Sequence, residues 1–122
     1  MTDDVRFVSA TPVLASLDIE RSVEFFCSSL GFSKLHVQQG VYGVITRGSV
    51  SIHFWACADR HIAENTSCRV RVEGIHTLFL ACTALNIVHP NAPLEEKPWG
   101  SREFAILDPD GNLVTFAEHT VA

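Results

Sequence analysis

The 122-residue sequence lacks the features that define several large classes of protein. It has 9 basic against 14 acidic residues, giving a formal net charge of −5 at pH 7, and a surface of that sign repels nucleic acid and anionic lipid. No apolar run approaches the roughly 20 residues that cross a bilayer. Residues 1–4 are polar and acidic, unlike the basic leader of a secretory signal. We therefore expect no nucleic acid and no membrane as partners, and a cytoplasmic location.

Cysteine is scarce, and its spacing indicates neither a zinc site nor a disulfide framework. The four cysteines form no CxxC pair, and each lies in an apolar stretch: Cys27, Cys57, Cys68 and Cys82. Reduced thiols in the cytosol fit this pattern. The sequence also has no nucleophile elbow, no Ser/His/Asp signature and no glycine-rich phosphate loop.

The sequence does contain enough hydrophobic material for one domain. Hydrophobic residues make up 47% of the chain and charged residues 19%, which is typical of a globular protein that buries a core. We interpret residues 1–122 as a single domain. Two amphipathic helices are predicted, at residues 19–30 between the N-cap Asp18 and the stop Gly31, and at residues 75–85 before Asn86.

Strand patterns surround both helices and form a repeat. Strands are predicted at residues 8–14, 34–37, 42–46, 50–57, 68–72, 87–89, 102–107 and 113–118. Glycines at positions 48 and 111 provide the positive φ that tight hairpin turns require. Matching positions such as Ile19 and Ile75, at the two helix starts, lie about 56 residues apart. The sequence therefore predicts an α+β fold of two βαβββ modules, about residues 8–57 and 67–119, each a curved mixed sheet with one helix on its outer face.

Strand alternation separates a buried set of side chains from a polar and aromatic set. In one strand, Ser51, His53 and Trp55 share a face, while the other face is apolar. In the corresponding strand of the second module, Ser67 and Arg69 alternate with apolar residues in the same way. Polar groups next to an aromatic ring are typical of a selective ligand cleft. We therefore predict that these five residues bind a ligand.

Trp99 is the strongest single candidate for ligand binding. It lies in a loop between Pro98 and Gly100, where a core role is less natural, and an indole face suits a flat heteroaromatic group or a cation. The alternative is that Trp99 merely covers the loop above the sheet. Tyr42 and His36 lie in strands that would flank the mouth of the cleft, and they complete the candidate set.

Several segments carry a family resemblance over residues 9–119. They are Pro12-Val13-Leu14, Val23-Glu24-Phe25-Phe26, Leu30-Gly31-Phe32-Ser33, Asp108-Pro109-Asp110-Gly111-Asn112 and, most specifically, Lys97-Pro98-Trp99-Gly100 with Arg102-Glu103-Phe104-Ala105. The sequence resembles the vicinal-oxygen-chelate (glyoxalase / bleomycin-resistance / dioxygenase) superfamily, and most of all its bleomycin-resistance proteins. This resemblance implies a homodimer whose N-terminal strand, hinged near Pro12, swaps to the partner and forms two clefts at the interface. It also implies that the clefts sequester a cationic glycopeptide antibiotic without changing it.

The resemblance also allows the metal-enzyme alternative to be weighed. Enzymes of this superfamily hold a divalent metal at four strand positions, which fall here at Thr11, His53, Ser67 and Thr115. His53 alone is a strong ligand type, whereas catalytic metal sites typically use about three protein ligands. Two acidic residues are general bases in principle, Glu103 and Glu118, but nothing in the sequence pairs either with an acid.

We therefore predict a binding protein without metal or other cofactor, and not an enzyme, that confers antibiotic resistance by sequestering bleomycin or another aromatic or cationic antibiotic. A metal-dependent lyase, isomerase or dioxygenase is the alternative, and a ligand-sensing or purely structural dimer is a third.

Two residues depart from the expected site of a cation binder. His36 and Arg69 stand where the family members carry further stacking aromatics, and Arg69 would place a positive charge inside the cleft. The resemblance therefore predicts the architecture of the site but leaves its ligand open, and a partly anionic aromatic molecule is an alternative to a cation.

Overall fold

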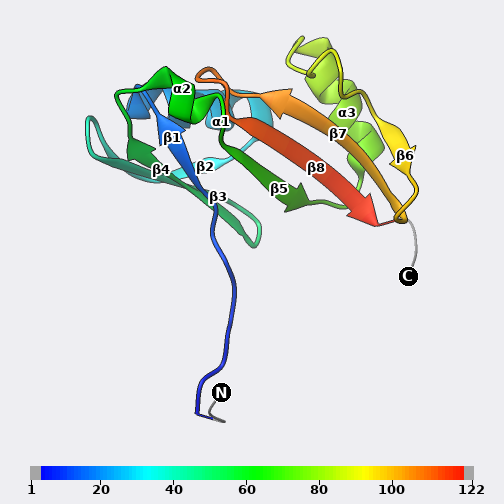
Figure 1. Ribbon diagram of the computed structural model, residues 1–122, viewed down its shortest axis with the longest axis horizontal. Coiled ribbons are helices and arrows are strands. Elements are labelled where there is room, and N and C mark those ends of the chain that lie inside the picture. Colours follow the sequence, from blue (N-terminus) through cyan, green and yellow to red (C-terminus); the bar gives the residue numbers. More distant parts are fainter. Residues whose placement is uncertain (1–3, 120–122) are drawn as a thin grey trace.

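The structure, a computed structural model, describes residues 4–119 and contains two four-stranded sheets (Figure 1). The first sheet has the order β1-β4-β3-β2, formed by β1 (Val13–Ser16), β2 (Ser33–Gln38), β3 (Tyr42–Arg47) and β4 (Val50–Ala56). The second has the order β5-β8-β7-β6, formed by β5 (Ser67–Arg71), β6 (Glu95–Lys97), β7 (Ser101–Leu107) and β8 (Leu113–His119). In each sheet the first strand pairs in parallel and the others pair antiparallel.

Helices occupy matching places in the two halves. Helix α1 (Ile19–Leu30) follows β1, and helix α3 (Ile75–Ala84) follows β5, while a short helix α2 (Arg60–Ala63) lies between the halves. This order confirms the predicted α+β fold with two βαβββ units. No helix within residues 4–119 is long and apolar enough to cross a membrane.

Helix α1 begins and ends where its sequence predicts. The side chain of Asp18 accepts a hydrogen bond from the Arg21 N–H at 3.1 Å, and Gly31 adopts a left-handed φ of 71°. The helix packs closely on β3, because a Cβ atom placed on Gly43 would lie 3.0 Å from the Ile19 side chain. Glycine at position 43 therefore lets the helix approach the sheet.

Aromatic clusters fill the core of each half. In the first half, the rings of Phe26 in α1 and Phe54 in β4 lie 5.3 Å apart. In the second half, Phe104 of β7 lies 5.2 Å from Phe79 of α3 and 5.3 Å from Phe116 of β8. These rings pack between helix and sheet, so the opposite face of each sheet carries the polar and aromatic side chains.

Three local predictions were wrong. Strand β1 begins at Val13. The carbonyl oxygen of Pro12 still accepts a hydrogen bond from the His53 N–H at 3.0 Å, but residues 5–11 run away from the first sheet as an extended arm (Figure 1). The strand predicted at residues 87–89 is a single bridge between Val88 and Ile106, and the fourth strand of the second sheet is β6. The second helix, predicted to end at residue 85, ends at Ala84, and Leu85 is its C-cap and is 50% exposed.

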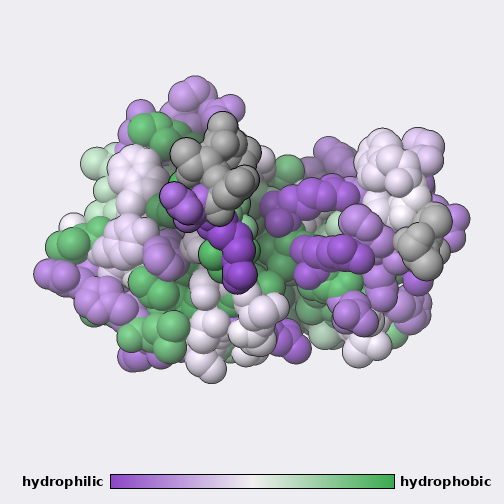
Figure 2. Space-filling model, turned by 90° about the horizontal axis from the view of Figure 1, so that it is seen from below, coloured by the Kyte–Doolittle hydropathy of each residue, from purple (hydrophilic) through white to green (hydrophobic). Residues whose placement is uncertain are grey.

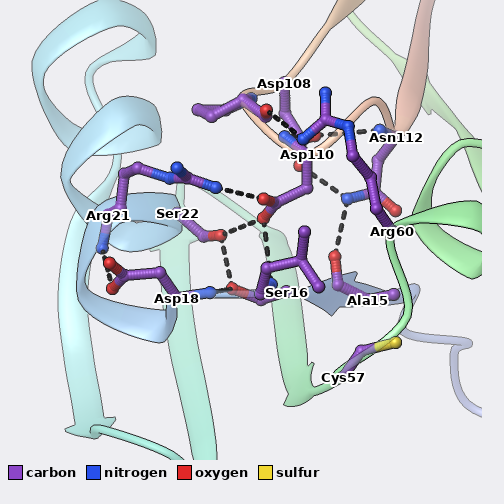
Figure 3. A network of polar contacts seen from close by, with 12 residues as sticks. Ala15, Ser16, Asp18, Arg21, Ser22, Cys57, Arg60, Asp108, Asp110 and Asn112 are labelled. Carbon is purple, nitrogen blue, oxygen red and sulfur yellow. Dashed lines mark hydrogen bonds and ion pairs between the residues drawn. The ribbon is translucent and has the colours of Figure 1, made fainter.

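A polar network joins the two halves of the chain (Figure 3). Asp110, in the turn between β7 and β8, is fully buried and pairs with Arg21 of α1. Its carboxylate also accepts a hydrogen bond from the hydroxyl of Ser22 at 3.2 Å. In the same turn, the side-chain amide of Asn112 donates to the carbonyl oxygen of Ala15 in β1 at 2.8 Å. The β7–β8 turn therefore fixes the second half against the corner between β1 and α1.

Candidate functional site

The polar face of the first sheet carries three of the predicted residues on one strand. Ser51, His53 and Trp55 lie along β4, and the residues between them, Ile52 and Phe54, are buried beneath the helix. Trp55 is 38% exposed. Strand alternation therefore placed the two faces of β4 correctly.

Tyr42 and His36 extend this face across the neighbouring strands. The phenol oxygen of Tyr42 lies 2.8 Å from Nδ1 of His53, and the two rings meet edge to face with their centroids 5.4 Å apart. His36 is exposed on β2, opposite Val44, which in turn lies opposite His53. The structure thus joins Tyr42 to His53 directly, and it places His36 two strands away in the same row.

The carboxylate of Glu103 is the shared hydrogen-bond acceptor for three polar side chains of the second sheet and its β6–β7 turn. Its carboxylate accepts two hydrogen bonds from the guanidinium of Arg69, at 3.0 and 2.5 Å. It also accepts one from the indole N–H of Trp99 at 2.7 Å and one from the hydroxyl of Ser101 at 2.5 Å. Arg69 is on β5 and Glu103 is on β7, so the arginine side chain spans β8 to reach the carboxylate. Glu103 is 5% exposed.

These contacts determine the charge of the second sheet's polar face. The hydrogen bonds from Arg69 lower the pKa of Glu103 to about 2, with further lowering from Ser101 and Trp99. In return, the hydrogen bond to Glu103 raises the pKa of Arg69. Both groups are therefore ionised at neutral pH, and their opposite charges cancel locally. Arg69 does not present the unpaired positive charge that its position in the sequence suggested.

Sequence reasoning missed the role of Glu103, which it considered only as a general base without a partner. A usable signal was present, because alternation along β7 puts Ser101 and Glu103 on one face, four residues or fewer from Trp99. The partner from β5 was not predictable without the strand order. Glu118 has a different role, since its carboxylate accepts hydrogen bonds from the backbone N–H groups of Gly74 and Ile75 at the start of α3.

A cleft of about 550 Å³ lies where the two halves meet. It brings together two predicted residues, Ser51 of β4 and Arg69 of β5, with Arg71, Glu73 and Thr11 also in its wall. Seen from below, hydrophobic side chains gather along the middle of the molecule, and hydrophilic ones form a band over its right half (Figure 2). Ser67 is exposed at the start of β5, on the same side of the strand as Arg69.

Of the four positions at which the resemblance would place metal ligands, His53 alone is a strong ligand type, and the other three carry hydroxyl groups. Nδ1 of His53 is already within hydrogen-bond distance of Tyr42, and Thr115 of β8 lies opposite Arg69 in the sheet. Within residues 4–119, no group of three or more His, Cys, Asp or Glu side chains is close enough to hold a metal ion. All four cysteines are free thiols, and burial raises the pKa of Cys68 to about 11.

Comparison with known proteins identifies the family. The whole chain, residues 1–122, matches the family model described as glyoxalase superfamily protein. A bleomycin resistance protein from Geobacillus stearothermophilus is 35% identical over 126 aligned positions, which cover 89% of this chain and 95% of the relative. The chain belongs to the bleomycin resistance proteins of the glyoxalase superfamily.

Solved structures agree with this family at the level of the fold. A bleomycin-binding protein from Streptomyces verticillus, crystallised with copper(II)-bleomycin, has a TM-score of 0.81 and 32% identity, covering 92% of this chain and 96% of that one. A lactoylglutathione lyase from Agrobacterium tumefaciens has a TM-score of 0.73 at 16% identity, covering 93% and 95%. At this identity the second likeness shows a shared fold alone. The chemistry of the lyase does not follow for this chain from the shared fold.

Proposed function

We propose that this protein binds a bleomycin-type antibiotic, withholds it without chemical change and so confers resistance. The observation that carries this proposal is Trp99, whose N–H is fixed by Glu103 while the residue stays 66% exposed. An indole held in this way offers a preordered surface on which a flat heteroaromatic group can stack. The 35% identity to a bleomycin resistance protein supports bleomycin as the first ligand to test.

The arrangement of the acidic residues favours binding over catalysis. A general base works best when its pKa lies near the operating pH, whereas the pKa of Glu103 is lowered to about 2 by its hydrogen bonds with Arg69, Ser101 and Trp99. Glu118 is occupied in capping α3. Both carboxylates named as general bases therefore have structural partners instead of a proton-transfer role.

We further infer that the site is completed by a second copy of the chain. The Tyr42–His53 pair and Trp55 lie on the first sheet, whereas Trp99 and Arg69 lie on the second. The arm that precedes Pro12 exposes apolar side chains, with Phe7 84% exposed and Val8 78% exposed. Such side chains favour contact with another surface. A homodimer in which the arms cross would cover them and bring the polar faces of different sheets together.

Tryptophan fluorescence tests the proposed function. Chelator-treated protein is titrated with metal-free bleomycin, in parallel with Trp99→Ala and Trp99→Phe. We expect saturable quenching in the parent protein, weakening of about tenfold or more in Trp99→Ala, and a smaller loss in Trp99→Phe because a stacking ring remains. Leu80→Ala, which truncates an exposed side chain on α3, is the matched control and should bind like the parent. No quenching of the parent at high bleomycin concentration would exclude this ligand.

A further inference from the structure

We propose that Glu103 sets both the orientation of Trp99 and the charge preference of the face around it, acting as a positioning residue. This inference rests on the proposed function, because it concerns the same site. It assigns the specificity of the site to a buried residue that sequence reasoning left without a role.

The orientation of Trp99 depends on a single polar anchor. The residue lies in the turn between β6 and β7, where the next residue, Gly100, has a φ of 86°. Because most of its surface is exposed, packing alone constrains its ring weakly. The 2.7 Å hydrogen bond from its N–H to Glu103 fixes one edge of the indole and leaves the rings available. Removing this acceptor should let the indole sample other rotamers.

The charge of the face depends on the same carboxylate. The Arg69 side chain is 51% exposed, and Glu103 is the group that neutralises it. On the neighbouring strand β6, Glu95 lies opposite Glu103 and is paired with Lys97 at 2.7 Å. Arg69–Glu103 and Lys97–Glu95 are thus two ion pairs within this sheet. Replacing Glu103 with a neutral residue would leave Arg69 as an uncompensated cation next to Trp99.

Collisional quenching tests the inference in the protein without ligand. The chain has two tryptophans, so a Trp55→Phe background leaves Trp99 as the reporter. In this background, Glu103→Gln should raise quenching by iodide and lower quenching by caesium, changing their ratio by about twofold or more, because the freed Arg69 attracts anions. Trp99 anisotropy should fall in Glu103→Ala, which, unlike Glu103→Gln, keeps no side-chain acceptor for the indole N–H. The double variant Glu103→Gln/Arg69→Gln removes both charges and should return the ratio close to its starting value.

Two ligands of different charge test the charge preference of this face in protein that retains Trp55. Metal-free bleomycin carries a cationic terminal amine, and bleomycinic acid carries a carboxylate in its place. Glu103→Gln should shift the ratio of their affinities by about tenfold toward the acid, and the double variant should reverse that shift. If Glu103 served only the fold, Glu103→Gln would weaken the binding of both ligands equally. The loss of affinity would then parallel a fall in the midpoint temperature of thermal unfolding.

The outcomes separate the two proposals. If the parent binds neither ligand while Glu103→Gln changes the quenching ratio as described, the bleomycin assignment fails and the role of Glu103 stands. If Glu103→Gln folds and leaves the iodide-to-caesium ratio unchanged, and Glu103→Ala folds and leaves the anisotropy unchanged, the role of Glu103 is overturned, whether or not bleomycin binds.

Discussion

Arg21 in α1 and Asp110 in the β7–β8 turn form an ion pair between residues 89 positions apart, in which the carboxylate is fully buried. The same carboxylate accepts hydrogen bonds from the Ser22 hydroxyl and from the backbone N–H of Leu17. A buried carboxylate with this many partners is costly to leave incomplete. The Asp-Pro-Asp-Gly-Asn turn therefore positions the second sheet against the first.

Removal of this carboxylate should destabilise the protein strongly. Asp110→Ala leaves the Leu17 N–H and the Ser22 hydroxyl without their acceptor, and we expect a loss of about 2–4 kcal/mol in the free energy of unfolding. Urea denaturation followed by circular dichroism measures it. Glu64→Gln, which alters the exposed pair with Arg60, should cost about 0–1 kcal/mol. Equal effects of the two substitutions would mean that the junction does not depend on Asp110.

The repeat in the sequence was sufficient to predict the fold. Two helices with matched starts at Ile19 and Ile75, strong stops at Gly31 and Asn86, and glycine turns are local signals, and each is confirmed by the backbone. Strand β6 was missed because Glu95-Glu96-Lys97 has no apolar alternation. Its pairing with β7 supplies the strand character that its residues lack.

The candidate site was predictable only in part, for a related reason. Alternation along β4 was enough to place His53 and Trp55 on the polar face. The Arg69–Glu103 pair depends instead on the order β5-β8-β7, which brings together residues 34 positions apart. Composition and periodicity carry no information on such a contact. Arg69 consequently looked like an unpaired charge in the sequence.

Acidification should selectively remove the contribution of Glu103. Its pKa is lowered from 4.5 to about 2 by the hydrogen bonds from Arg69, so its stabilising effect is complete above about pH 4.5 and is lost as the pH falls through about 2. The parent protein should exceed Glu103→Gln in stability at pH 7, and the difference should shrink between pH 4.5 and 2. Urea midpoints at several pH values measure it. A difference that is constant over this range would contradict the ion pair.

The exposed arm should govern association of the chain. Phe7 and Val8 are among its most exposed apolar residues, and burying them against a second copy would stabilise a dimer through the hydrophobic effect. The double substitution Phe7→Ser/Val8→Ser should shift the protein toward monomer in sedimentation velocity at about micromolar concentration. Leu80→Ser, on α3, is the control and should leave the mass unchanged. A monomeric parent protein, or a variant that sediments like the parent, would argue against the arm-linked dimer.

The most direct test of the account combines calorimetry with mass spectrometry on one sample. Chelator-treated protein is titrated with metal-free bleomycin in the calorimeter. The ligand is then released by denaturation, and its mass is determined by mass spectrometry. We predict saturable binding of about one bleomycin per subunit, as expected for two clefts in a symmetric dimer, and recovery of the antibiotic with unchanged mass. No heat of binding, or a recovered ligand with altered mass, would contradict sequestration without chemistry.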